Sequence, residues 1–475
     1  MRMHDELDRT APVTVVDWAQ AERTVFLAAA ERGAEYLAGI RNRRVAPARG
    51  DVDALHDLGG PLPETPTDPA DVLDLLDRIG SPATVANAGG RYFGFVNGGA
   101  VPAARAAMVL AAAWDQNASF RVMSPVAAAL EEICLHWIAD ILQLPPGCGG
   151  AFVTGATMAN FAGLAAARHA LLARVGWNVE ADGLFGAPPL RVVVGDDVHA
   201  AVLKALALVG FGRDRVVRVA VDAQGRIRPD ALPPLTSSTI VCVQAGNVNS
   251  GAFDPFSDIC RAARDAGAWV HVDGAFGLWA AASPARSHVV RDVGRADSWA
   301  TDAHKWLNVP YDCGVVLVRH GEALKDAMHL QAPYLPAQPA REPMHWTPEM
   351  SRRARVVEVW AALRSLGRAG VRDLVERTCT HAQRFAAGLT AAGYTILNDV
   401  VINQVLVAFA DDAHTERVIS AVQEDGTCWC GGTRWQGRAA MRISVSSWAT
   451  TKADVDLSLE AIVRIARAVG SDCLR

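Results

Sequence analysis

The chain has 475 residues, of which 51% are hydrophobic and 20% are charged, and its formal net charge is −5. This globular composition has enough length for two or three structural units around sizeable cores. The mild acidity gives no reason to expect nucleic acid or a membrane surface as a partner, and no uninterrupted apolar run is long enough to span a bilayer.

The cysteines and the N-terminus bear on the cellular compartment. Nine cysteines, an odd number scattered along a long chain, are not a disulfide framework, so we expect a reducing cytoplasm. The first eight residues are polar and acidic with no apolar segment after them, which predicts no signal peptide. Cys428 and Cys430 form the one close pair, and without further ligands nearby we expect two packed thiols and no metal site.

Residues 1–85 are predicted to form a helical N-terminal arm. Trp18 to Ile40 has the pattern of an amphipathic helix, and residues 41–68 are rich in Pro, Gly and Asp. Such an arm buries little by itself, so we expect it to pack on the rest of the chain or on a partner subunit.

Residues 86–345 alternate helices with short apolar strands. The expected strands are 191–194, 239–243, 268–272 and 314–318, and the expected helices are 126–144, 157–175, 199–209 and 256–266. This alternation predicts an α/β domain whose mostly parallel sheet is covered on both faces. Ligands in such sheets bind beyond the carboxyl ends of the strands.

Residues 346–475 are predicted to form a small α+β domain. Helices are expected at 351–366 and 371–391, and strands at 403–409 and 440–445.

Two residues at strand ends suggest a cofactor. Asp273 ends the apolar strand 268–272, and Lys305 lies in the segment 298–319, just before another apolar strand. Pyridoxal 5'-phosphate (PLP) requires an amine for its aldehyde and an anion for its ring nitrogen. A lysine and an aspartate at the ends of neighbouring strands suit that cofactor.

The segment around Lys305 resembles the lysine signature of the PLP-dependent group II amino-acid decarboxylases, which include the aromatic-amino-acid, tyrosine, histidine and glutamate enzymes. The resemblance runs from about Tyr92 to about Asp456. It implies the fold-type I architecture of the aspartate aminotransferases, with Lys305 as the Schiff-base lysine and Asp273 beside the pyridine nitrogen. It further implies cofactor contacts from Gly155, Ala156, Thr157, His199, Ala275 and His304.

Each of these residues also has a simpler interpretation. A lone lysine is usually a solvated charge, and a strand-end aspartate often caps a turn. The sequence Gly155-Ala156-Thr157 at the start of a helix is by itself a capping pattern, whereas the family turn holds the cofactor phosphate. His199 is expected to stack on the pyridine ring, although an isolated histidine is more often a cap or a core residue.

The chain departs from the family pattern at two places. Asn247 and Val248 stand where many members carry hydroxyl groups; we include Asn247 among the cofactor contacts, but leave the group that contacts O3' unassigned. Asp302 stands where several members have an asparagine near the phosphate. A carboxylate beside a phosphate is unfavourable unless it is screened or turned away, so no phosphate contact is assigned to Asp302.

Tyr334 bears on the type of reaction. It aligns with a tyrosine of a mobile loop that is thought to deliver a proton to Cα after carbon dioxide leaves. Relatives that perform oxidative deamination tend to have phenylalanine there, so Tyr334 favours simple decarboxylation. The alternative is a tyrosine that anchors a proline-rich loop.

The substrate pocket is expected to form from two segments, 92–97 and 114–120. They offer Phe95, Asn97, Asn117 and Ser119 as substrate contacts. Asn117 and Ser119 replace apolar residues of the aromatic-amino-acid enzymes, which makes the pocket more polar and leaves the substrate open.

The sequence thus predicts PLP-dependent decarboxylation of an L-amino acid to an amine and carbon dioxide. The resemblance implies a homodimer with the active site at the subunit interface. The alternatives are a decarboxylation-coupled oxidative deaminase, another PLP lyase or transaminase on the same scaffold, and a non-catalytic PLP-binding relative.

Overall fold

The computed structural model describes residues 15–331 and 340–471, and the chain divides into two compact units, 1–89 and 90–475. The first unit contains α1 (Val15–Gly39), α2 (Arg49–Asp53) and α3 (Pro69–Gly80). Helix α3 has Pro69 at its first position, where the missing N–H of proline costs no helical hydrogen bond. The Asp68 side chain caps this end by accepting the Ala70 amide at 2.8 Å. Arg32 of α1 pairs with Asp74 of α3.

A seven-stranded sheet dominates the second unit, with the strand order β1-β7-β6-β5-β4-β2-β3. Its strands are β1 (Gly149–Val153), β2 (Arg191–Gly195), β3 (Val217–Val219), β4 (Thr239–Gln244), β5 (Trp269–Asp273), β6 (Ser298–Asp302) and β7 (Gly314–Val318). The pairs β3-β2-β4-β5-β6 are parallel, and β7 is antiparallel to both β6 and β1. The predicted mostly parallel α/β sheet is confirmed.

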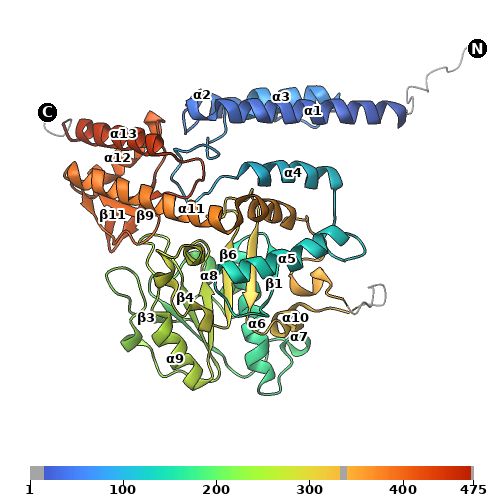
Figure 1. Cartoon of the computed structure of the whole chain (residues 1–475), viewed down its shortest axis with the longest axis vertical. Helices are drawn as coiled ribbons and strands as arrows, with labels where there is room; N and C mark the ends of the chain where they lie inside the picture. The colour runs from blue at the N-terminus through green and yellow to red at the C-terminus, as the bar shows by residue number, and fades with distance from the viewer. Residues whose placement is uncertain (1–14, 332–339, 472–475) are drawn as a thin grey trace, which may run out of the picture. The chain divides into compact units, whose positions relative to one another are not determined.

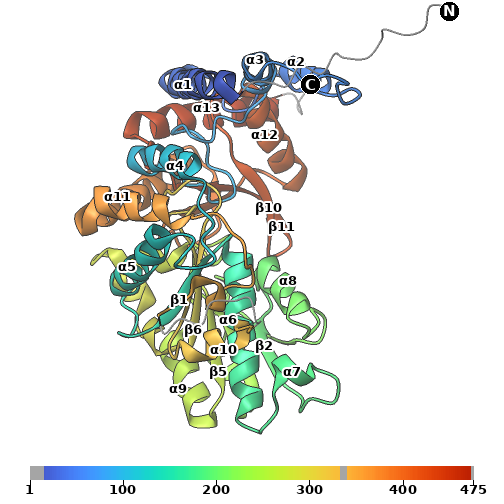
Figure 2. The ribbon, with the colours of Figure 1, turned by 90° about the vertical axis from the view of Figure 1, so that its right-hand side faces the viewer.

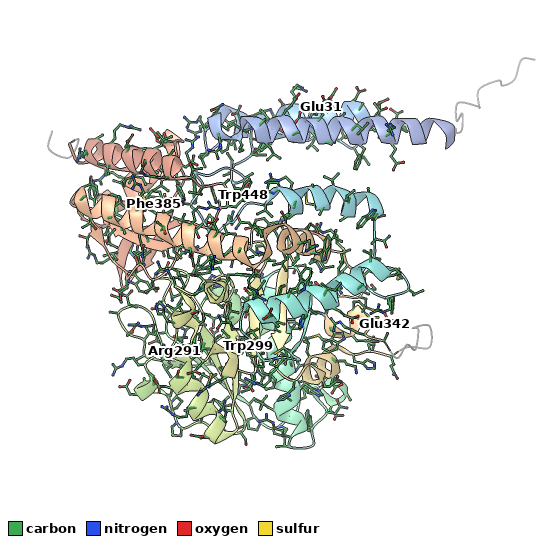
Figure 3. All side chains as sticks on the ribbon, in the orientation of Figure 1. Glu31, Arg291, Trp299, Glu342, Phe385 and Trp448 are labelled. Atoms are coloured by element: carbon green, nitrogen blue, oxygen red, sulfur yellow. The ribbon has the colours of Figure 1, made fainter. Side chains whose placement is uncertain are left out.

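Helices cover both faces of this sheet, as Figure 1 and Figure 2 show. One face packs on α6 (Ala156–Ala173), α8 (Ala200–Leu208) and α10 (Glu322–Met328), and a short α7 (Val179–Asp182) adjoins α6. The other face packs on α5 (Pro125–Ile141) and α9 (Phe256–Ala266), with α4 (Pro102–Trp114) and α11 (Val356–Ala391) farther out in the same cluster. Trp299 of β6, labelled in Figure 3, is fully buried on that second face. Because both faces are covered, strands such as β2, β4 and β7 are nearly continuous apolar runs.

Helix α11 differs from the prediction at its start. Helix was expected from Ser351, but α11 begins at Val356, and Gly367 (φ 58°) breaks it into the two expected parts. The helix does not extend back to Ser351, because Arg353 forms a β-bridge with Asn117 and the Arg352 backbone amide donates to the Asn117 side chain at 3.2 Å. These long-range contacts outweigh the local helical pattern.

A second sheet follows, with the order β10-β11-β9-β8. It is formed by β8 (Thr395–Ile396), β9 (Gln404–Ala408), β10 (Gly431–Trp435) and β11 (Arg438–Ser444), and it packs on α11, α12 (Asp412–Asp425) and α13 (Lys452–Ser471). Phe385 of α11 lies in this core, where Figure 3 labels it. The predicted α+β character of residues 346–475 agrees with these elements, whereas its separation as a domain stays a prediction. Within the described ranges, no helix has the length and apolar character needed to cross a membrane.

Candidate active site

Lys305 and Asp273 follow neighbouring parallel strands. Strands β5 and β6 are paired so that Asp273 lies opposite Ala300. Beyond the strands, the Gly274 amide donates to the Ala300 carbonyl at 2.9 Å, and the Asp302 amide donates to the Ala275 carbonyl at 2.8 Å. The two candidate residues therefore share the carboxyl edge of the sheet, where ligands bind in such folds.

The turn that carries Lys305 is fixed on both sides. The amides of Ala303 and His304 donate to the Cys313 carbonyl, and the Cys313 amide donates back to Nδ1 of His304 at 3.1 Å. The buried Asn308 side chain donates to the Trp306 carbonyl at 2.9 Å. This network holds the backbone of the turn before any ligand binds.

The Lys305 side chain contacts a buried carboxylate. Its Nζ lies 3.0 Å from Oδ2 of Asp302, a residue that is only 2% exposed. The other oxygen of Asp302 accepts the Ala156 amide at the start of α6, at 2.6 Å. Asp302 therefore joins the lysine to the helix start at which the sequence predicts a phosphate.

One pocket is lined by four of the predicted site residues, His199, Asp273, Ala275 and Lys305. Its lining consists of His199, Gln244, Gly246, Val248, Asp273, Ala275, Phe276 and Lys305. Gln244, Val248 and Phe276 were not predicted as site residues. Gln244 could have been found, because it ends β4 directly opposite Asp273 in the register.

His199 serves as a helix cap and also lines this pocket. Its Nδ1 accepts the Ala201 amide at 3.2 Å at the start of α8. Burial lowers the pKa of His199, and the charge of Asp273 partly opposes that effect. A neutral ring that accepts at Nδ1 carries its proton on Nε2.

His304 lies on the other side of the lysine. Its Nε2 is 3.6 Å from Asp302, and its ring stacks on Tyr311 with 4.3 Å between centroids. Burial lowers the pKa of His304, so its ring is neutral at neutral pH. The Tyr311 hydroxyl in turn donates to the Asn97 side chain at 2.6 Å, which brings Asn97 next to the lysine turn.

An aromatic group lies near Asn97. Trp429 stacks on Tyr92 with 5.1 Å between centroids and contacts Phe95 at 5.4 Å. Phe95 is 60% exposed, which an ordinary core residue would not be. Tyr311 and Trp429 were missed as candidates, since nothing in the sequence links residue 429 to residue 92.

A half-buried cation was also missed. Arg442 of β11 donates weakly to the Val248 carbonyl at 3.3 Å and to the Asn249 side chain at 3.4 Å. Its charge acts on both His199 and Tyr92, and burial lowers its own pKa. Within the described residues no carboxylate pairs with it.

Asn117, Ser119 and Asn247 are among the predicted residues that do not line this pocket in their own chain. The side-chain amide of Asn117 donates to the Ser351 hydroxyl at 3.1 Å, and the buried Ser119 hydroxyl donates to the side-chain oxygen of Asn117 at 2.8 Å. The Asn247 oxygen accepts the amides of Asn249 and Ser250 in its own loop, so Val248 and not Asn247 lines the pocket. Tyr334 lies outside the described residues.

Within the described parts of the chain, no group of three or more His, Cys, Asp or Glu side chains is arranged so that it could hold a metal ion. Cys428 and Cys430 are free and fully buried, and contact between the two thiols together with burial raises the pKa of Cys430.

The comparisons with known proteins agree with this geometry. The family model described as the pyridoxal-dependent decarboxylase conserved domain matches residues 89–410. The chain belongs to the pyridoxal-dependent decarboxylase family. Accordingly, its cofactor is PLP and its reaction class is the decarboxylation of an amino acid.

Individual relatives of this decarboxylase are distant. It is 27% identical to an aromatic-L-amino-acid decarboxylase from Bacillus atrophaeus over 72% of each chain, and 28% identical to an L-2,4-diaminobutyrate decarboxylase from Rhizobium meliloti over 88% of this chain and 86% of that one. The fold matches the crystal structure of Oryza sativa TDC with PLP and tryptamine, with a TM-score of 0.87, 22% identity, and coverage of 96% of this chain and 99% of that one.

The residues of this decarboxylase fit PLP. An amine and a carboxylate, Lys305 and Asp273, line one pocket, and Ala275 adds a small side chain to the lining. Helix α6 begins at Gly155 without a side-chain cap of its own, and a side chain added at Gly155 would lie 3.3 Å from His304. An 18-residue helix that presents its first amides beside a glycine suits a phosphate group.

Proposed function

We propose that Lys305 forms the covalent attachment to PLP and that Asp273 pairs with the protonated ring nitrogen. The observation that supports this assignment is that the two side chains line one pocket at the ends of adjacent parallel strands. When bound, PLP supplies the electron sink into which the Cα–carboxylate bond of the substrate breaks. The carboxylate of Asp273 keeps that sink effective because it stabilises the positive charge on the ring nitrogen.

His199 and the start of α6 are proposed to position the cofactor. The His199 ring lines the pocket and is held by its hydrogen bond to Ala201, so it can stack on a flat ligand without further ordering. Gly155, Ala156 and Thr157 offer the first amides of α6 and one hydroxyl to a phosphate. Such a turn fixes one end of the ligand while Lys305 fixes the other.

Tyr334 is proposed as the group that protonates Cα after carbon dioxide leaves. A phenol is a suitable general acid once a loop closes and excludes water. This assignment rests on the sequence, and it makes the product an amine and not an aldehyde.

We propose that the enzyme works as a homodimer. Residues 114–120, which carry Asn117 and Ser119, do not reach the pocket of their own chain, and apolar side chains nearby are exposed. Leu110 is 54% exposed and Val122 is 69% exposed. A partner subunit would cover these side chains and bring residues 117 and 119 to a neighbouring active site.

The substrate side is proposed to form from Phe95, Asn97, Tyr92 and Trp429, with Arg442 as the cation that attracts a carboxylate. The curated relatives act on aromatic amino acids in one case and on 2,4-diaminobutyrate in another, so we propose an L-amino acid without naming it. We also propose that the enzyme is cytoplasmic. The eight described cysteines are all free, as is usual in a reducing compartment.

Absorbance spectra test the proposal. Purified wild type, Lys305→Ala and Lys204→Ala are reconstituted with PLP; Lys204 is an exposed lysine of α8 and serves as the control. The visible band of lysine-bound cofactor is expected in wild type and the control and is expected to be absent in Lys305→Ala. A band that survives in Lys305→Ala contradicts the assignment of the lysine.

An L-amino-acid panel then tests the reaction. Carbon dioxide release without oxygen uptake is expected, together with one equivalent of amine. Oxygen uptake with an aldehyde product would instead identify the oxidative alternative, and a keto product without carbon dioxide would identify transamination.

A further inference from the structure

Asp302 is a buried anion at the place where a second anion is expected. It is 2% exposed, and its Oδ1 accepts the Ala156 amide at 2.6 Å. Its Oδ2 lies 3.0 Å from the Lys305 ammonium and 3.6 Å from Nε2 of His304. The carboxylate therefore already uses one amide of the α6 turn and the charge of the lysine.

The amide that Asp302 takes is one that a phosphate would need. The first amides of an α-helix have no partner within the helix, and Gly155 provides no side-chain cap. A side chain added at Gly155 would lie 3.5 Å from Oδ1 of Asp302, which shows that no other group separates the carboxylate from the turn. A phosphate that binds this turn through the Ala156 amide must displace Oδ1 from it.

Electrostatics adds to this competition. A phosphate ester carries between one and two negative charges at neutral pH. A carboxylate within a few ångströms repels it, and burial weakens the screening by water. The backbone of Asp302 is held in place, because its amide donates to the Ala275 carbonyl at 2.8 Å and its carbonyl accepts Nε1 of Trp279 at 3.0 Å. The carboxylate therefore cannot move far from the phosphate position.

We propose that Asp302 is an internal competitor of the cofactor phosphate. In the cofactor-free protein it caps α6 and neutralises Lys305, and when PLP binds it gives up both partners. Asp302 thus lowers the affinity for PLP and keeps the empty site ordered, so that cofactor loading is reversible. This inference rests on the proposed role of the α6 turn as the phosphate holder.

Binding measurements on the cofactor-free protein test the inference. The dissociation constants of inorganic phosphate and of PLP are measured for wild type and Asp302→Asn, using calorimetry and the cofactor absorbance. Asparagine keeps an oxygen for the Ala156 amide but removes the charge. We expect Asp302→Asn to bind both ligands at least tenfold more tightly.

A matched control and two further variants make the test specific. The control is Asp297→Asn. Asp297 is a half-buried carboxylate that directly precedes β6, at the end of the strand away from Asp302, and it accepts the Val270 amide. This variant should change neither dissociation constant by more than twofold. Covalent attachment is impossible in Lys305→Ala and in the double variant Lys305→Ala, Asp302→Asn. The double variant should still bind inorganic phosphate more tightly than Lys305→Ala does, because the effect of Asp302 on phosphate does not depend on the lysine. Asp302→Ser, also uncharged, replaces Asp302→Asn if that variant does not fold.

The outcomes separate the inference from the proposed function. If wild type forms the visible cofactor band but the uncharged variants bind phosphate and PLP equally or more weakly, Asp302 is an ordinary helix cap and the inference is wrong while the function stands. If no folded variant binds either ligand, the phosphate role of the α6 turn is wrong and the inference is wrong with it.

Discussion

The Nε2 atom of His271 lies 2.9 Å from the side-chain oxygen of Asn160. On its other side, Nδ1 of the neutral ring accepts the Ser298 hydroxyl at 2.8 Å, and the Ser298 oxygen accepts Nε1 of Trp269 at 2.9 Å. His271 is fully buried in β5, Asn160 belongs to α6, and Ser298 begins β6. This chain of hydrogen bonds thus joins the helix of the proposed phosphate turn to β5, which ends at Asp273, and to β6, which precedes the turn that carries Lys305.

The neutral imidazole of His271 has hydrogen-bond partners for both nitrogens, and its burial disfavours the charged form, which predicts a loss of stability in acid. Burial lowers its pKa to about 3. The unfolded chain takes up a proton near pH 6.5 while the folded chain does not, so stability is complete above that pH and falls as the pH drops from about 6.5 toward 3. In urea unfolding at several pH values, the free energy of unfolding of His271→Gln should change less with pH than that of wild type.

The control for this prediction is His288→Gln, which changes an exposed histidine. It should keep the wild-type slope. Equal slopes for His271→Gln and wild type would show that carboxylates account for all of the acid sensitivity.

The parts of the structure set by local patterns could be predicted from the sequence. Apolar runs and helix periodicity located β2, β4, β5, β7 and α9 within a residue or two. Lys305 and Asp273 were singled out by their places near strand ends together with the family resemblance, while β6, the strand before Lys305, was not among the expected strands.

The contacts between distant segments could not be predicted in this way. Trp429 meets Tyr92, and Arg442 reaches the pocket from β11, through packing of the second sheet that no local pattern encodes. The sequence singles out Asp302 as an anion where a phosphate is expected, but its contacts with Lys305 and Ala156 depend on folding that brings residues 156 and 302 together.

Gly98 is predicted to be essential for the position of Lys305. A methyl group at Gly98 would overlap the Lys305 carbonyl oxygen and would crowd Asn308. Gly98→Ala must therefore displace the lysine turn, at a cost of about 1–3 kcal/mol or more. We expect urea unfolding to show this loss and the visible cofactor band to weaken.

Gly33→Ala provides the comparison. Gly33 lies within α1, and a methyl group there meets nothing within 4 Å. Alanine is the better helix former by about 0.5–1 kcal/mol, so this variant should be as stable as wild type or more stable. A Gly98→Ala variant that also matches wild type would mean that the lysine turn tolerates displacement.

Arg442 is predicted to act on substrate affinity. A half-buried guanidinium without a carboxylate partner among the described residues can pair with a carboxylate of the substrate, and a charge-assisted hydrogen bond contributes about 1.5–3 kcal/mol. Arg442→Gln should therefore raise KM at least tenfold, with a smaller effect on kcat and no change in the cofactor band.

Arg438→Gln, on the exposed end of the same strand, is the matched control and should leave KM unchanged. A loss of the cofactor band in Arg442→Gln would instead assign Arg442 to the structure of the pocket.

Tyr334 decides the product if it protonates Cα. Removal of its hydroxyl in Tyr334→Phe takes away the general acid, and such groups contribute about 10²–10⁴-fold in rate. We expect amine formation to fall by that factor while carbon dioxide release falls less, with the difference appearing as oxygen uptake and aldehyde. Tyr394→Phe, a tyrosine that packs on Phe409 in the second sheet's core, should behave as wild type. Unchanged amine formation in Tyr334→Phe would return Tyr334 to the role of a loop anchor, and the proton would then have to come from another group of the closed site.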